Sequence, residues 1–72
     1  MTLEQILTEL NTIGAAQAQM LNNELYISIT NYPDSLTAID SFFTLYNTQL
    51  KNLYPEVKTF VAENGSIKAI IK

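Results

Sequence analysis

The C-terminal stretch of the chain, residues 56–72, reads EVKTFVAENGSIKAIIK and contains the clearest structural signal in the sequence. Asn64 and Gly65 lie between two runs in which apolar and polar side chains alternate. Both residues tolerate the positive φ that a type I′ turn requires, and this turn commonly joins two adjacent antiparallel strands. We therefore predict a β-hairpin in which residues 56–63 pair with residues 66–72.

A two-residue turn also fixes which residues of this hairpin face each other. Glu63 faces Ser66 in this register, and successive pairs lead away from the turn until Lys58 faces Ile71. The hairpin then has two distinct faces. The face that we assign to the core carries Phe60, Ala62, Ile67, Ala69 and Ile71. The opposite face carries Thr59, Val61, Lys68, Ile70 and Lys72.

A further strand is predicted at residues 24–30, which are rich in β-branched and aromatic side chains. Its apolar positions, Leu25, Ile27 and Ile29, alternate with Tyr26, Ser28 and Thr30. If this strand pairs beside the hairpin, Tyr26 joins Val61 and Ile70 on one uncovered face of the sheet. The order of the strands stays open, because either strand of the hairpin could lie next to residues 24–30.

Between these strands, an apolar stripe predicts a long helix that begins at Asp34 or Ser35. The members of the stripe recur every three or four residues and are Leu36, Ile39, Phe43, Tyr46, Leu50 and Leu53. Pro55 disfavours helical geometry at the residue before it, so the helix should end shortly before this proline. Phe42 and Leu45 lie on the flank of the stripe, where an apolar surface could bind a partner.

The N-terminal segment begins with Thr2 and Gln5, which have the spacing of a capping box and predict a helix start. The apolar stripe of this helix is Leu3, Ile6, Leu7, Leu10 and Ile13. An interior Gly14 would let the helix continue through residues 15–21, which we favour because Ala and Gln have high helix propensity. A Gly14 with positive φ would instead end the helix, and residues 15–21 would form a strand hairpinned to residues 24–30.

Together these elements predict one compact α+β domain that spans residues 1–72. We expect an antiparallel or mixed sheet of three strands, or of four if the first helix ends at Gly14. Both helices should lie on one face of this sheet, because each helix is apolar along a single stripe. The predicted core comprises Leu3, Ile6, Leu7, Leu10, Leu25, Ile27, Ile29, Leu36, Ile39, Phe43, Tyr46, Leu50, Phe60, Ile67, Ala69 and Ile71.

Composition restricts the chemistry that the chain can perform. It has no Cys and no His, which removes thiolate metal sites, cysteine nucleophiles and imidazole bases. No phosphate-binding, dinucleotide-binding or metal-binding motif is present, and the carboxylates are scattered. We therefore expect no catalytic residues, no metal and no cofactor, and a protein that is not an enzyme.

Charge is distributed unevenly along the sequence. The five acidic residues of positions 1–50 have no basic counterpart, whereas positions 51–72 carry four Lys and two Glu. Because phosphate binding needs clustered Lys and Arg and the chain has no Arg, nucleic-acid binding is a weak hypothesis. Neither a signal peptide nor a long apolar run is evident, so we expect a cytoplasmic protein without membrane insertion.

These exclusions favour a small acidic protein-binding module with an accessory or regulatory role. Two surfaces could receive the partner: the helix flank of Phe42 and Leu45, or the uncovered sheet face of Tyr26, Val61 and Ile70. The alternative is a structural subunit that self-associates through the open sheet face or a sheet edge. Abundant Asn, Ile, Lys and Tyr are typical of AT-rich bacterial or phage genomes, which suggests a phage or mobile-element protein that acts on a host protein.

Overall fold

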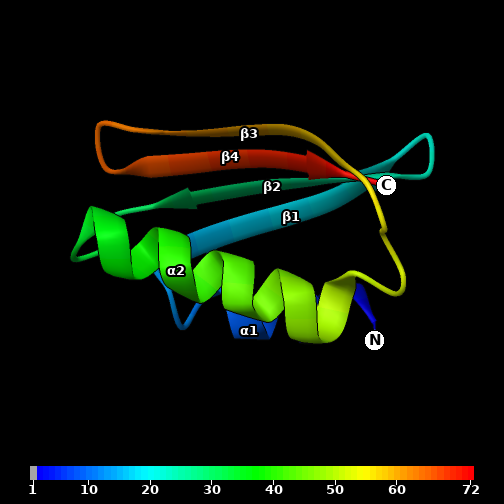
Figure 1. The fold of residues 1–72 in the computed structure, drawn as a ribbon, viewed down its shortest axis with the longest axis horizontal. Helices are drawn as coiled ribbons and strands as arrows, with labels where there is room; N and C mark the ends of the chain where they lie inside the picture. Colours follow the sequence, from blue (N-terminus) through cyan, green and yellow to red (C-terminus); the bar gives the residue numbers. More distant parts are fainter. Residues whose placement is uncertain (1) are drawn as a thin grey trace.

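A computed structural model describes residues 2–72 of the chain. The elements follow the order α1 (Leu3–Leu10), β1 (Ala15–Leu21), β2 (Glu24–Thr30), α2 (Ser35–Leu45), a π-helical turn η1 (Tyr46–Leu50), β3 (Val57–Glu63) and β4 (Ser66–Ile71). The four strands form one antiparallel sheet in the order β1-β2-β4-β3. Both helices lie on the same face of this sheet (Figure 1). The predicted α+β class and C-terminal hairpin are therefore confirmed, and the sheet has the four strands of the alternative prediction rather than the favoured three.

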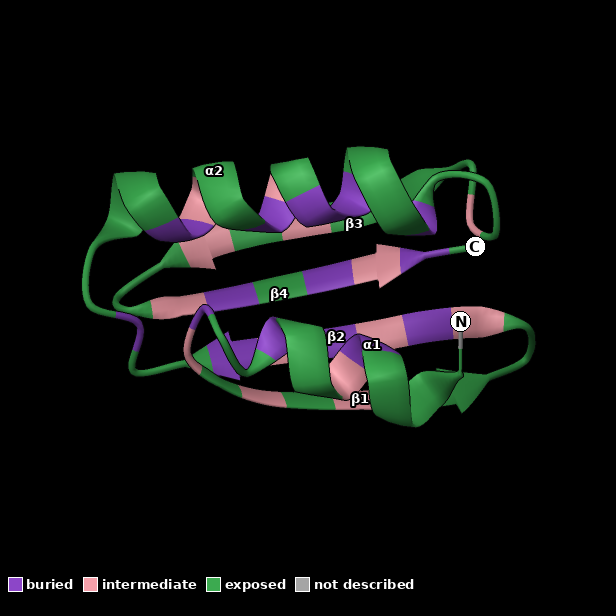
Figure 2. Cartoon of the chain, turned by 90° about the horizontal axis from the view of Figure 1, so that it is seen from below, coloured by how far each residue is buried: buried purple, intermediate pink, exposed green. Residues whose placement is uncertain are grey.

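The chain consists of two successive units, each a helix followed by a β-hairpin. The strands of each hairpin are joined by a two-residue turn with positive φ, at Asn22-Asn23 in the first and at Asn64-Gly65 in the second. The central strands β2 and β4 run antiparallel, with Ile27 opposite Ala69. The two halves are thus related by an approximate twofold axis perpendicular to the sheet. In Figure 2, α1 lies over β1 and β2, and α2 runs along β3.

The predicted register of the second hairpin holds near its turn, where Glu63 pairs with Ser66 and Phe60 with Ala69. It is wrong at Lys58, which does not face Ile71. The pairing shifts between Val57 and Thr59, so that Val57 is opposite Ile71. An extra residue in one strand is a β-bulge, and alternation of side chains alone does not predict it.

The favoured continuation of the first helix through residues 15–21 is also wrong. The capping box is present, with Gln5 N–H donating to Thr2 Oγ1 at 3.2 Å and Thr2 N–H donating to Gln5 Oε1 at 2.8 Å, but α1 ends at Leu10. Residues 15–21 form β1 and pair with β2 along their full length. Differences in helix propensity among ordinary residues amount to only ~0.5 kcal/mol per residue. Pairing with a neighbouring strand therefore overrides the preference of Ala and Gln for a helix.

Gly14 follows the first helix, but without the positive φ that the alternative prediction gave it. It is absent from the positive-φ residues of the described chain. A Cβ at this position would lie 2.7 Å from the carbonyl oxygen of Thr30 and 3.1 Å from Cβ of Tyr32. Glycine is therefore needed because the chain passes close to the end of β2 as it enters β1.

The face that α2 turns toward the sheet differs from the prediction. Phe42 is completely buried and Leu45 is 9% exposed, whereas Leu36 is 76% exposed. Ile39 and Phe43 are only half-buried. The apolar residues of α2 cover a broad arc of the helix, opposite a polar side that carries Thr37, Ser41 and Thr44, so their spacing fits two faces about 100° apart.

A π-helical turn continues α2 at its C-terminal end. Lys51 N–H donates to the carbonyl oxygen of Tyr46 at 2.8 Å, which adds one residue to this turn. Tyr46 and Leu50 are buried, as predicted. The buried core comprises Ile6, Leu10, Ile13, Leu25, Ile27, Ile29, Tyr32, Ala38, Phe42, Leu45, Tyr46, Leu50, Ile67, Ala69 and Ile71. Of the predicted core residues outside α2, Leu3 is exposed, and Leu7 and Phe60 are half-buried.

Candidate functional site

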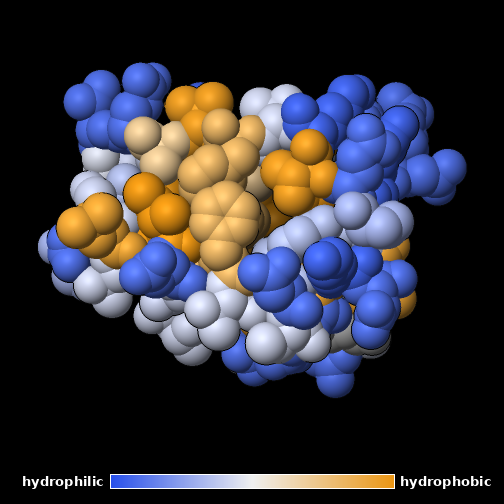
Figure 3. Space-filling view, viewed as in Figure 1, coloured by the Kyte–Doolittle hydropathy of each residue, from blue (hydrophilic) through white to orange (hydrophobic). Residues whose placement is uncertain are grey.

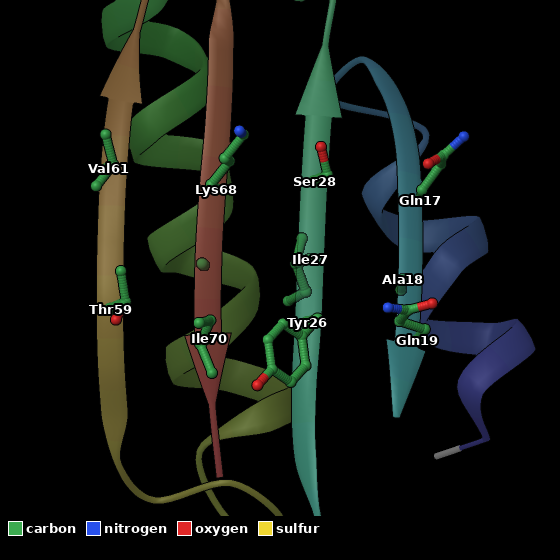
Figure 4. A pocket seen from close by; sticks show the side chains of 11 residues that line it. Gln17, Ala18, Gln19, Tyr26, Ile27, Ser28, Thr59, Val61, Lys68 and Ile70 are labelled. Carbon is green, nitrogen blue, oxygen red and sulfur yellow. The ribbon is translucent and has the colours of Figure 1, made fainter. Parts of the chain in front are cut away.

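The sheet face opposite the helices, which we call the open sheet face, carries the candidate site. Residues from all four strands surround a central hollow of about 350 Å³ (Figure 4). Its floor is the main chain of Ile27 and Ala69, whose side chains point into the core on the other side. Helices cover only one side of the sheet, so nothing in the described part of the chain covers this hollow.

The register of the strands places the side chains of the open sheet face in two rows. The first row runs across the sheet through Gln19, Tyr26, Ile70 and Thr59. The second row runs through Gln17, Ser28, Lys68 and Val61. The ring of Tyr26 extends toward Ile70 on the neighbouring strand (Figure 4). Tyr26 and Ile70 are half-buried and Val61 is 44% exposed, so the structure brings these three sequence-predicted residues onto one accessible face.

An ion pair borders this face at the end where β2 begins. Lys58 Nζ lies 2.6 Å from Glu24 Oε2, and this contact joins β3 to β2 across β4. The Tyr26 hydroxyl also donates to Glu24 Oε1, at 3.3 Å. The hydrogen bond from Lys58 lowers the pKa of the Glu24 carboxyl, and the same bond raises the pKa of the Lys58 ammonium. Both charges are thus already paired within the molecule.

Lys68 is different, because it is the charged residue that lines the central hollow. Its side chain is exposed, and it forms no salt bridge with any residue from 2 to 72. The hollow therefore combines an apolar centre with one unpaired cation and a margin of amide and hydroxyl groups. Such a surface can hold an apolar side chain and attract an adjacent carboxylate.

Phe42 and Leu45, the other predicted docking residues, are not on the surface. Phe42 packs its ring 5.5 Å from that of Phe60, between centroids, and both it and Leu45 belong to the core. The prediction that they form an exposed flank is wrong, because α2 is rotated relative to the predicted stripe. These residues stabilise the fold and are not available to a partner.

The rotation of α2 leaves a second apolar surface that the sequence did not indicate. We call it the α2–β3 seam, and it consists of Leu36, Ile39, Phe43 and Phe60. The rings of Phe43 and Phe60 are 4.7 Å apart between centroids. Figure 3 shows hydrophobic atoms gathered between β3 and α2 on this side of the molecule. Both rings also pack against the buried ring of Phe42, so the seam borders the core.

A polar groove of about 440 Å³ separates the two helices on the opposite side. Its walls carry the hydroxyls of Thr12, Thr44 and Thr48 and the carboxylates of Glu9 and Asp40. Among residues 2–72, no three potential metal ligands of the His, Cys, Asp and Glu types come together. Both carboxylates line this groove rather than the open sheet face.

No protein-family model matches the chain, and comparisons with curated proteins and with solved structures give no match. Within the described residues, no helix has the length and apolar character needed to cross a membrane. The function must therefore be inferred from the surfaces that the fold presents.

Proposed function

We propose that the chain is a small non-enzymatic protein-binding module, accessory or regulatory in role, whose open sheet face docks a segment of a partner protein. One observation carries the proposal: the central hollow combines apolar side chains with Lys68, a cation that has no ionic partner among residues 2–72. An uncovered apolar centre with a polar margin is the usual composition of a protein interface.

The chemistry of the hollow specifies the segment that it would receive. Tyr26, Val61 and Ile70 form an apolar contact surface, and a tyrosine in such a position is a common interface hot spot. Lys68 lies directly across from Val61 in the neighbouring strand. A partner segment would therefore place an apolar side chain in the hollow and an Asp or Glu within one or two residues of it.

Self-association through the same face is the weaker candidate. Two open sheet faces that stacked on each other would bring Lys68 of one copy close to Lys68 of the other. Like charges at the centre of an interface oppose association, and neither lysine would gain a carboxylate in exchange. An acidic partner avoids this repulsion.

Selection from a library of random peptides tests the proposal with three variants. Wild type should select peptides in which an apolar residue is adjacent to Asp or Glu. Val61→Asp, at an exposed position, should lose these peptides without unfolding, and Lys68→Glu should select peptides with Lys or Arg beside the apolar residue. Thr44→Asp, in the groove between the helices, is the matched control and should select the same peptides as wild type. Identical selections by wild type and Lys68→Glu would contradict the proposal.

A further inference from the structure

The two edge strands of the sheet differ in how well they are protected from pairing with another chain. On β3, the bulge at Lys58 and the charge of Glu63 interrupt the edge, and both features discourage a further strand from pairing. On β1, residues 15–21 read AAQAQML, with no charged residue and no proline. This strand also pairs with β2 without any shift in register, so it contains no bulge. The β1 edge is therefore the one that can accept another strand.

The hairpin geometry identifies which main-chain groups of β1 point outward. After a two-residue turn, Leu21 and Glu24 exchange hydrogen bonds with each other, and bonded positions recur at every second residue. The groups of Ala16, Ala18 and Met20 then point away from β2. A hydrogen bond at Ala16 is consistent with this orientation, because its N–H donates away from β2 to Oδ1 of Asn11 at 3.0 Å. Asn11 thus occupies one end of the β1 edge and leaves Ala18 and Met20 available.

An apolar flank accompanies this free edge on the helix side. Successive residues of α1 are rotated by about 100°, which places Leu3 and Leu7 on the side of the helix toward Asn11. Glu9 lies on the other side, where it lines the groove between the helices. Leu3 is 38% exposed and Met20 is 41% exposed, while Leu7 is half-buried. Part of the apolar stripe of α1 therefore faces the β1 edge without cover.

We infer that two copies of the chain associate by antiparallel pairing of β1 with β1, with Gln19 of each copy facing Gln19 of the other on the twofold axis. In this register Ala18 of one copy exchanges hydrogen bonds with Met20 of the other. A register centred on Ala18 would place Met20 opposite Ala16, where the Asn11 side chain already binds the main chain. Asn11 therefore excludes the register centred on Ala18, and the register centred on Gln19 pairs both free positions of the edge, Ala18 and Met20.

A second copy fits this edge better than an unrelated strand does, because it supplies its own Leu3, Leu7 and Met20. These side chains would cover their counterparts across the axis, as expected of an isologous interface. The axis is perpendicular to the sheet, so both helical layers lie on one side and both open sheet faces on the other. Within one copy, β2 and β4 already pair antiparallel about an approximate twofold axis of the same orientation. The pairing is independent of the proposed docking function, because it leaves the central hollow of each copy accessible.

Disulfide crosslinking tests the register, since the natural chain contains no cysteine. Facing Gln19 residues form a non-hydrogen-bonded pair with Cα atoms about 4.5 Å apart, which is within the range of a disulfide. Gln17 lies two residues away on the same face, and its two copies would be ~14 Å apart. Gln19→Cys should therefore form a crosslinked dimer under mild oxidation, and Gln17→Cys should remain monomeric. Equal crosslinking of the two variants, or none with Gln19→Cys, would overturn the inference.

Light scattering from micromolar to millimolar concentration tests the pairing itself. The wild-type mass should rise with concentration from 8.1 kDa toward twice that value. Ala18→Pro removes an outward N–H without breaking a bond to β2, so this variant should stay folded, as circular dichroism can verify, and monomeric. The matched control is Ala62→Pro, whose N–H points outward on the β3 edge by the same geometry, and its mass should follow that of wild type. A wild type that is monomeric throughout, or a dimer that survives Ala18→Pro but not Ala62→Pro, would refute the inference.

Discussion

Lys58 and Glu24 form an ion pair that ties the edge strand β3 to the central strand β2, with Nζ and Oε2 2.6 Å apart. The pair joins strands that are not neighbours, because β4 lies between them. It also holds Lys58, the residue at the β-bulge, against the open sheet face. This contact should make the stability of the protein depend on pH.

Glu24→Gln should lower the melting temperature at neutral pH and have no effect in strong acid. The hydrogen bond from Lys58 lowers the pKa of Glu24 in the folded state, so the stabilisation is present above the ordinary carboxyl pKa and is lost as the pH falls through the lowered value. The raised pKa of Lys58 implies a second loss in strong base, as the pH rises through that value. Melting curves across the pH range measure both effects.

Glu63→Gln is the matched control for this prediction, because Glu63 forms no salt bridge with the residues from 2 to 72. Its melting temperature should follow that of wild type more closely than that of Glu24→Gln at neutral pH. A Glu24→Gln variant whose deficit is the same at every pH would show that the ion pair does not stabilise the fold.

Phe42→Ala should destabilise the protein far more than Phe43→Ala. Phe42 is fully buried, and truncation of a buried Phe costs ~3–5 kcal/mol. Phe43 lies in the half-exposed α2–β3 seam, so its truncation should cost roughly half as much or less. Urea denaturation of both variants measures the two free energies of unfolding. A larger loss from Phe43→Ala would mean that α2 turns its other face to the sheet.

Gly14→Ala should destabilise the protein by ~1–3 kcal/mol, which is the usual cost of overpacking. The new Cβ would approach the carbonyl oxygen of Thr30, a main-chain atom that cannot move aside like a flexible side chain. Gly65→Ala provides the comparison, because its site has open space and a φ of +74°, so only backbone strain opposes the substitution. A stabilised Gly14→Ala would instead indicate a continuous helix through this position.

Local sequence signals were sufficient for some elements and insufficient for others. Asn64-Gly65 and the alternation in residues 24–30 identified their strands, because a turn type and a period of two depend only on nearby residues. Residues 15–21 fit both a helix, which their Ala and Gln favour, and the alternative strand, and pairing with β2 decides for the strand. The face that α2 turns toward the sheet depends on competition between two apolar faces, which the sequence does not resolve.

The residues of the candidate site were likewise only partly predictable from the sequence. Tyr26, Val61 and Ile70 were grouped on one face from alternation, on the condition that β2 pairs beside the hairpin. Lys68 was placed on this face too, but its lack of an ionic partner is a property of the folded chain. Gln19 joins the site only because β1 is a strand. The favoured helix at residues 15–21 would have left this wall of the hollow unpredicted.

Amide chemical shifts of the labelled protein, followed during titration with a peptide that wild type selects, test the docking proposal most directly. The proposal predicts shifts that are largest at Tyr26, Ser28, Lys68 and Ile70, around the central hollow. Amides of Thr37 and Thr44, in the groove between the helices, should stay unchanged. Shifts centred instead on Ile39 and Phe43 would place the partner on the α2–β3 seam and contradict docking at the open sheet face.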